Sequence, residues 1–153
     1  MNTGRRGVSL LPTSMNGAGF HMTITVTRDR TGKMRHVVAV RAHRVAVDEL
    51  PAVGGEDSGP TPHDLYDASV AACKAVTMVW YANRKHIPLA DVTVSVERDD
   101  SEERAGKYRL HARLTLGGEL TQAQREELRN VAAKCPVHRL MTQAVTEITT
   151  ELA

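Results

Sequence analysis

The stretch Thr61-Pro-His-Asp-Leu-Tyr-Asp-Ala-Ser-Val-Ala-Ala-Cys73-Lys-Ala-Val76 decides the fold, because it predicts a long helix with a clear start. Thr61 can cap this helix, Pro62 suits its first position, and Asp64 completes a capping box three residues after the cap. Helical character continues to about residue 84, and Pro88 ends it. Apolar residues follow one side of the helix: Leu65, Ala68, Ala72, Val76 and Val79.

Alternation of apolar and polar residues predicts strands before and after this helix. The turn chemistry of Asp29–Gly32 indicates a hairpin between the first two of them. The glycines of the loop at 48–60 suggest a specific backbone path, and a polar loop at 99–106 joins the two strands that follow the helix. The expected strands lie at 22–27, at 37–47 as one long strand or two short ones, at 92–96, at 108–116 and at 146–152.

A second helix is expected after Thr121, which can form a capping box with Gln124. The residue before a proline is disfavoured in helical conformation, so Cys135 before Pro136 marks a break with a short helical turn after it. The predicted order is β-β-β-α-β-β-α-β, an α+β pattern. We expect one domain over residues 22–153, preceded by a flexible arm over residues 1–21, which show no periodicity.

Composition narrows the class of protein. A chain of 153 residues can bury a core without disulfides or metals, and with 3% aromatic residues that core must be aliphatic. The net charge of +2 argues against a nucleic-acid surface, and no apolar run reaches the roughly 18 residues that a membrane span needs. The apolar stretch after Arg6 is too short for a signal peptide. A cytoplasmic protein with reduced thiols is the expectation.

The two cysteines, Cys73 and Cys135, lie in unlike contexts. They are too few for a disulfide-rich scaffold or a four-cysteine zinc site, which leaves either two inert thiols or a reactive pair. Cys73 lies on a mostly apolar helix face, where it could simply be a small packed side chain. Cys135 precedes a helical turn whose free N–H groups favour a thiolate, and His138 and Arg139 could add positive charge. Zinc bound by the two cysteines and His138 rests on a weak signal, and we expect no metal or other cofactor.

Three segments resemble the OsmC/Ohr family, the osmotically induced and organic hydroperoxide resistance proteins. They are Gly54–Pro62, Asp64–Cys73 and Lys134–Arg139, and Tyr81–Lys85 before Ile87-Pro-Leu89 resembles a subgroup of the family. The resemblance extends over roughly residues 22–153. It implies an intertwined homodimer, in which two chains exchange N-terminal strands and two central helices lie between the sheets.

The resemblance also implies a thiol peroxidase of the oxidative stress response. Cys73 would attack an organic hydroperoxide and become a sulfenic acid, which Cys135 would resolve as an intramolecular disulfide. A dithiol reductant of the lipoyl or thioredoxin type would then restore both thiols. No nucleic acid or membrane partner is implied.

The sequence departs from the family pattern near the first cysteine. The best-studied members carry a glutamate ten residues before it, paired with an arginine from the N-terminal strands, and this chain has His63 there. His63 could replace part of the positive charge, whereas Asp64 is better explained as the helix cap. Three arginines are candidates for the pairing, with Arg44 taken as the supporting residue: Arg28, Arg41 and Arg44.

Two other functions remain open at this point. One is a non-catalytic module of the same fold, which binds an apolar small molecule and has structural cysteines. The other is a different thiol enzyme such as a disulfide reductase, against which the absence of a Cys-x-x-Cys motif counts.

Overall fold

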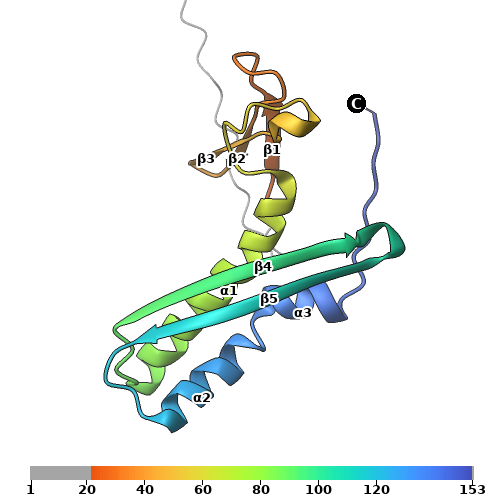
Figure 1. Cartoon of the computed structure of the whole chain (residues 1–153). Helices are drawn as coiled ribbons and strands as arrows, with labels where there is room; N and C mark the ends of the chain where they lie inside the picture. The colour runs from red at the N-terminus through yellow and green to blue at the C-terminus, as the bar shows by residue number, and fades with distance from the viewer. Residues whose placement is uncertain (1–21, 153) are drawn as a thin grey trace, which may run out of the picture.

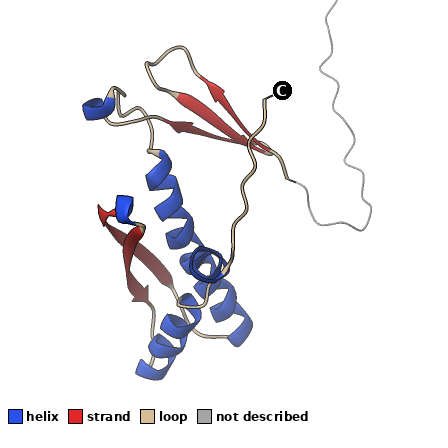
Figure 2. Cartoon of the chain, turned by 90° about the vertical axis from the view of Figure 1, so that its right-hand side faces the viewer, coloured by secondary structure: helices blue, strands red, loops and turns tan. Residues whose placement is uncertain are grey.

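The computed structural model describes residues 22–152, so the expected arm at 1–21 lies outside the described residues. A long helix forms the axis of the molecule, a two-stranded hairpin crosses it, and two shorter helices pack beside it (Figure 1). A small three-stranded sheet lies beyond the N-terminal end of that helix, away from the hairpin (Figure 2). This is the α+β architecture that the sequence predicts.

The axial helix α1 spans Pro62–Lys85 and begins as predicted. The Thr61 hydroxyl accepts a hydrogen bond from the Asp64 N–H at 3.1 Å, and the Asp64 carboxylate accepts one from the Thr61 N–H at 2.9 Å. This reciprocal pair satisfies two amides that have no partner inside the helix. The helix ends at His86, which adopts a left-handed conformation with φ of 54°.

The small sheet consists of β1 (Ile24–Arg28), β2 (His36–Val40) and β3 (His43–Val47) in antiparallel order. The sequence left one long strand or two short ones open over 37–47, and the structure has two, separated by a tight turn with Arg41 at φ 53°. The predicted hairpin between β1 and β2 is present, with the Asp29 N–H donating to the Arg35 carbonyl at 2.9 Å.

The loop after β3 has the specific path that its glycines suggest. A Cβ on Gly55 would lie 1.9 Å from the Glu49 carbonyl oxygen, so no other residue fits there. Asp48 is almost fully buried and accepts hydrogen bonds from the Glu56 N–H, the Ser58 N–H and the Ser58 hydroxyl at 3.1, 3.1 and 2.7 Å. These contacts fix the chain that leads into α1.

The hairpin of β4 (Asp91–Glu102) and β5 (Lys107–Gly117) is longer than predicted. The polar residues expected to form a loop at 99–106 extend β4 instead, and only a short 3₁₀ turn, η2 (Glu103–Ala105), separates the strands. The reason is that polar side chains pair across the strands: Arg109 of β5 binds Asp99 of β4 at 2.8 Å. Polarity therefore does not end the ladder here.

Helix α2 (Gln122–Ala132) packs against α1 and supplies half of the core. Its predicted capping box between Thr121 and Gln124 is present. The fully buried cluster consists of Met78 and Ala82 from α1 with Leu128 and Ala132 from α2. A third helix, α3 (Pro136–Gln143), follows the predicted break at Cys135, whose backbone is extended. None of the helices in residues 22–152 is long and apolar enough to cross a membrane.

The expectation of a last strand at 146–152 is wrong for the chain by itself. This segment leaves α3 as an extended tail without a ladder partner (Figure 1). A strand requires a neighbour for its N–H and C=O groups, and the described chain offers none to this segment. Its apolar side chains Ile148 and Leu152 are exposed, Ile148 by 83%.

The apolar side noted for α1 is also exposed rather than buried. Val76 is 68% exposed and Val79 is 41% exposed, and the neighbouring Trp80 is 58% exposed. The face that packs inside the chain carries Asp67 and Lys74 as well as apolar residues. One chain thus leaves an apolar helix face uncovered.

Candidate functional site

The two cysteines, which lie far apart in the sequence, come together where α1 meets the start of α3. Both are free thiols, with Cys73 half-buried on α1 and Cys135 fully buried immediately before α3. The Val137 N–H in the first turn of α3 donates to the Cys73 sulfur at 3.5 Å. Cys73 also lies close enough to Cys135 to contribute to the pKa shift of that buried thiol. Two thiols therefore share the N-terminus of one helix.

Burial raises the pKa of the Cys135 thiol, and the neighbouring Cys73 thiol adds to this rise. The backbone N–H of His138 and the positive charge of Lys74 oppose it. These directions follow from general electrostatics, since desolvation disfavours a thiolate whereas a donor or a nearby cation stabilises it. The accessible thiol at this site is thus Cys73, and Cys135 is its shielded neighbour.

Lys74 is a site residue that sequence reasoning missed. Only 7% of this residue is exposed, and its ammonium donates to the Ala132 carbonyl at 3.0 Å. It also lies 3.1 Å from His138 Nδ1, and since an ammonium can only donate, the ring nitrogen is the acceptor of this contact. The available signal is helical spacing, because Lys74 is four residues from Val70 and from Met78, both on the buried face.

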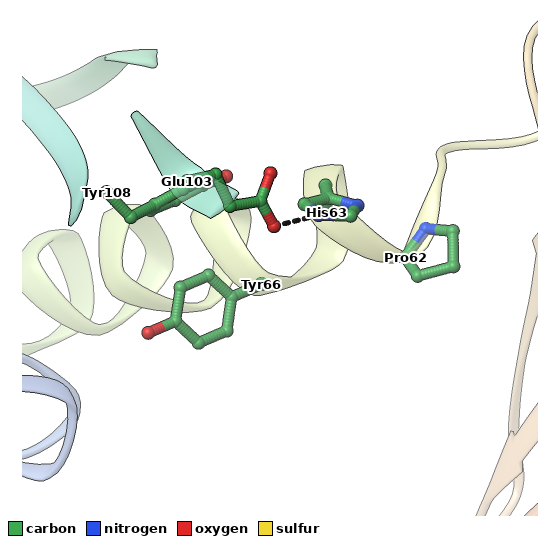
Figure 3. A pocket seen from close by; sticks show the side chains of 5 residues that line it. All are labelled: Pro62, His63, Tyr66, Glu103 and Tyr108. Carbon is green, nitrogen blue, oxygen red and sulfur yellow. Dashed lines mark hydrogen bonds and ion pairs between the residues drawn. The ribbon is translucent and has the colours of Figure 1, made fainter. Parts of the chain in front are cut away.

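His63 lies in the first turn of α1, where it pairs with Glu103 at 3.0 Å (Figure 3). Glu103 raises the pKa of His63 by accepting this hydrogen bond. Ten residues of helix separate His63 from Cys73, about 15 Å along the axis. Within one chain, His63 therefore serves a shallow hollow of about 390 Å³ beside Tyr66 and Tyr108 rather than the thiols.

Asp64 acts as the predicted helix cap and also pairs with an arginine. Arg98 Nη2 binds Asp64 at 2.7 Å, and Arg98 Nε binds the buried Asp67 at 2.6 Å. The Thr61 N–H and then Arg98 lower the pKa of Asp64. The Tyr108 hydroxyl completes the cluster with a 2.9 Å bond to Asp67, and burial followed by this bond raises the pKa of Tyr108 to about 12.

The arginine that pairs with Asp64 comes from β4, whereas the candidates considered from sequence lie in or beside β1–β3. Arg98 continues the inward register of Val92, Val94 and Val96, and a charged residue at such a position was the available signal. Arg44 is exposed on β3 of the small sheet, which lies beyond the N-terminal end of α1 (Figure 1). The structure brings Arg44 and His63 to neither cysteine within one chain.

A cavity of about 610 Å³ adjoins the thiol site between α1, the hairpin and α3. Tyr66, Val70, Tyr108 and Met141 contribute to its wall, together with Lys74 and His138 from the thiol site. Its size falls in the range of small-molecule sites, and its wall is largely apolar. Among residues 22–152, no three His, Cys, Asp or Glu side chains are grouped to hold a metal ion.

The fold is an α+β scaffold with two free thiols at the junction of α1 and α3. The profile of the OsmC-like protein family matches residues 55–151, and the chain belongs to this family. No curated protein sequence matches the chain.

Solved structures share the fold at low sequence identity. An OsmC-like protein from Mycoplasma pneumoniae is 16% identical, with a TM-score of 0.66 over 82% of this chain and 90% of that one. The organic hydroperoxide resistance protein OsmC of Legionella pneumophila is 22% identical, with a TM-score of 0.60 over 83% and 93%. The organic hydroperoxide resistance protein OhrB of Bacillus subtilis is 20% identical, with a TM-score of 0.54 over 81% and 92%.

Proposed function

We propose that this protein is a cysteine-based peroxidase that reduces organic hydroperoxides in defence against oxidative stress. The observation that carries the proposal is the meeting of Cys73 and Cys135 at the N-terminus of α3. Membership of the OsmC-like family supports it, as do structural relatives named as organic hydroperoxide resistance proteins.

In the first step, the Cys73 thiolate attacks the terminal oxygen of the hydroperoxide. The O–O bond breaks, the sulfur becomes a sulfenic acid, and the organic part leaves as an alcohol after gaining a proton. The half-buried position of Cys73 gives a peroxide access, and the Val137 N–H stabilises the negative sulfur. The largely apolar cavity that Lys74 and His138 line suits an organic rather than a small polar peroxide.

In the second step, the Cys135 thiolate attacks the sulfur of the Cys73 sulfenic acid. An S–S bond forms, the S–O bond breaks, and hydroxide leaves as water after protonation. A dithiol reductant of the lipoyl or thioredoxin type returns the pair to thiols and is itself oxidised to a disulfide. Burial keeps Cys135 away from the peroxide and next to Cys73, as this order requires.

The working unit of this proposal is a homodimer. The exposed apolar side chains of α1 and of the small sheet support it, since monomers rarely leave a large contiguous apolar surface uncovered. They include Ile24, Val26, Val76 and Trp80, exposed by 60%, 57%, 68% and 58%. In such a dimer, Arg44 of the small sheet is the candidate to supply positive charge to the Cys73 of a second copy.

Single-turnover oxidation tests the proposal. One equivalent of cumene hydroperoxide should consume both thiols of the wild type and produce one intramolecular disulfide. Cys73→Ser should consume no peroxide, whereas Cys135→Ser should complete one turnover and leave a sulfenic acid that a cyclic 1,3-diketone traps. Equal peroxide consumption by Cys73→Ser and wild type would refute the assignment.

The cavity between α1, the hairpin and α3 favours a second candidate, a non-catalytic module that binds an apolar small molecule. This function predicts saturable binding of apolar ligands and no loss of thiols when cumene hydroperoxide is added. The same single-turnover experiment therefore separates the two functions.

A further inference from the structure

Lys74 is a buried cation without a carboxylate partner among residues 22–152. Removal of an ammonium from water is costly unless other groups compensate for it. Here the compensation comes from a carbonyl oxygen and an imidazole nitrogen, the groups of Ala132 and His138. Such an arrangement leaves most of the positive charge unneutralised beside the thiols.

The two partners place this charge at the Cys135-Pro136 turn. Ala132 is the last residue of α2, where the carbonyl oxygens carry the negative end of the helix dipole. His138 lies in the first turn of α3, the helix that Cys135 precedes. Lys74 is bound at both sides of the turn, and the Cys135 N–H donates to the same Ala132 oxygen at 3.4 Å.

We propose that Lys74 is a positioning residue for the resolving step: held by Ala132 and His138, its ammonium keeps a positive charge beside Cys135 so that this buried sulfur can attack Cys73. The inference rests on the proposed function and deepens it. The effect of Lys74 on the Cys135 pKa, a lowering that opposes burial, has the direction that the proposal requires.

Few other groups act on the Cys135 sulfur. From α1 these are Cys73 and Lys74, and from its own helix the N–H of His138, whose imidazole contacts Lys74, whereas Arg139 is exposed. The α2 end contributes the Ala132 carbonyl and no titratable side chain, and Lys134 in the turn is exposed. A change in the pH dependence of Cys135 after substitution of Lys74 is therefore attributable to the lysine together with the His138 ring that it contacts.

The test uses an aromatic disulfide, 5,5′-dithiobis(2-nitrobenzoate), so that it needs no peroxide. The Cys73 thiolate attacks this reagent, forms a mixed disulfide and releases one nitrothiobenzoate. Cys135 then attacks the Cys73 sulfur, forms the intramolecular disulfide and releases the second nitrothiobenzoate. Absorbance of the released thiolate follows both phases by stopped flow, and Cys135→Ser, which should show only the first phase, confirms their order.

Lys74→Met, which keeps most of the length and removes the charge, should leave the first phase within about twofold of wild type. Its second phase at pH 7 should be about tenfold slower, as expected when a thiol pKa rises by about one unit, and should approach the wild-type rate by pH 10. Lys74→Arg, which keeps the charge, should stay within about threefold of wild type at every pH.

A second phase in Lys74→Met equal to wild type overturns the proposal. A second phase slowed equally at every pH also overturns it, because it indicates lost packing rather than lost charge. If Lys74→Met does not fold, His138→Ala at the half-buried His138 takes its place. Its second phase should be about threefold slower at pH 7 and return to the wild-type rate at high pH. A second phase equal to wild type at every pH would contradict the proposal. Failure of the wild type to consume peroxide would refute the proposed function and leave this test intact.

Discussion

Replacement of Arg98 should destabilise the protein more than that of any exposed arginine in the hairpin. Its guanidinium binds Asp67 at 2.6 Å and Asp64 at 2.7 Å, and Asp67 is only 8% exposed. In Arg98→Met, the Asp67 carboxylate would stay buried with the Tyr108 hydroxyl as its remaining partner. Loss of one partner from a buried ion pair costs about 3–5 kcal/mol. The side chains of Arg98 and Asp64 are 27% and 47% exposed, so water compensates for part of the lost ion pair. We therefore expect Arg98→Met to lower the free energy of unfolding by about 2–3 kcal/mol.

Urea unfolding followed by circular dichroism measures this cost. With an m-value of about 1–3 kcal/mol/M, the midpoint should fall by about 0.7–3 M. All variants must be compared at one protein concentration, because association of two chains would make the apparent stability depend on concentration.

Two further variants make the reasoning refutable. Arg109→Met removes an arginine that pairs with Asp99 at 2.8 Å on the exposed face of the hairpin, and its cost should stay within about 0.5 kcal/mol. The double variant Arg98→Met/Asp67→Asn should recover about 1 kcal/mol relative to Arg98→Met, because a neutral amide is easier to bury than a carboxylate. Equal costs for the two arginines, or no recovery in the double variant, would show that Arg98 does not neutralise a buried charge.

Three more predictions concern the loop, the core and the exposed face. The Ser58 hydroxyl, ahead of the backbone N–H donors and against burial, lowers the pKa of Asp48 from 3.8 to about 2. The ionised Asp48 carboxylate therefore stabilises the fold above about pH 4, and this contribution is lost as the pH falls from about 4 to 2. The free energy of unfolding of Asp48→Asn should accordingly decline less steeply than that of the wild type over this pH range. Met78→Ala should cost about 3 kcal/mol in urea unfolding, because Met78 is fully buried, whereas Val53→Ala on an exposed turn should cost less than about 0.5. Trp80 is the single tryptophan, so its emission should shift to longer wavelength on dilution if the exposed face of α1 is a dimer interface, and an emission independent of concentration together with monomeric light scattering would contradict the dimer.

Local sequence signals predicted much of the fold because they act within a few residues. The capping boxes at Thr61 and Thr121 and the break at Cys135-Pro136 each depend on contacts within one helical turn, and all three are present. The strand predicted at 146–152 is absent because a strand needs a partner. Alternation of apolar and polar residues along one segment does not show whether a neighbouring strand is available to pair with it. The exposure of the apolar side of α1 could not be predicted for the same reason. Periodicity identifies an apolar helix face but does not show which part of the structure covers it.

The site residues also differ in whether local or long-range contacts define them, and only those with a local signal could be predicted. Cys73 and Cys135 could be identified because each lies in a distinctive local context, and the resemblance then joined them. Lys74 and Arg98 were missed because each is defined by partners 30 or more residues away, Ala132 and His138 for the lysine and Asp64 and Asp67 for the arginine. Both could have been suspected as charges at inward positions of an otherwise apolar register. A charge at such a position needs a compensating group, and each of these two has found it in a different element of the fold.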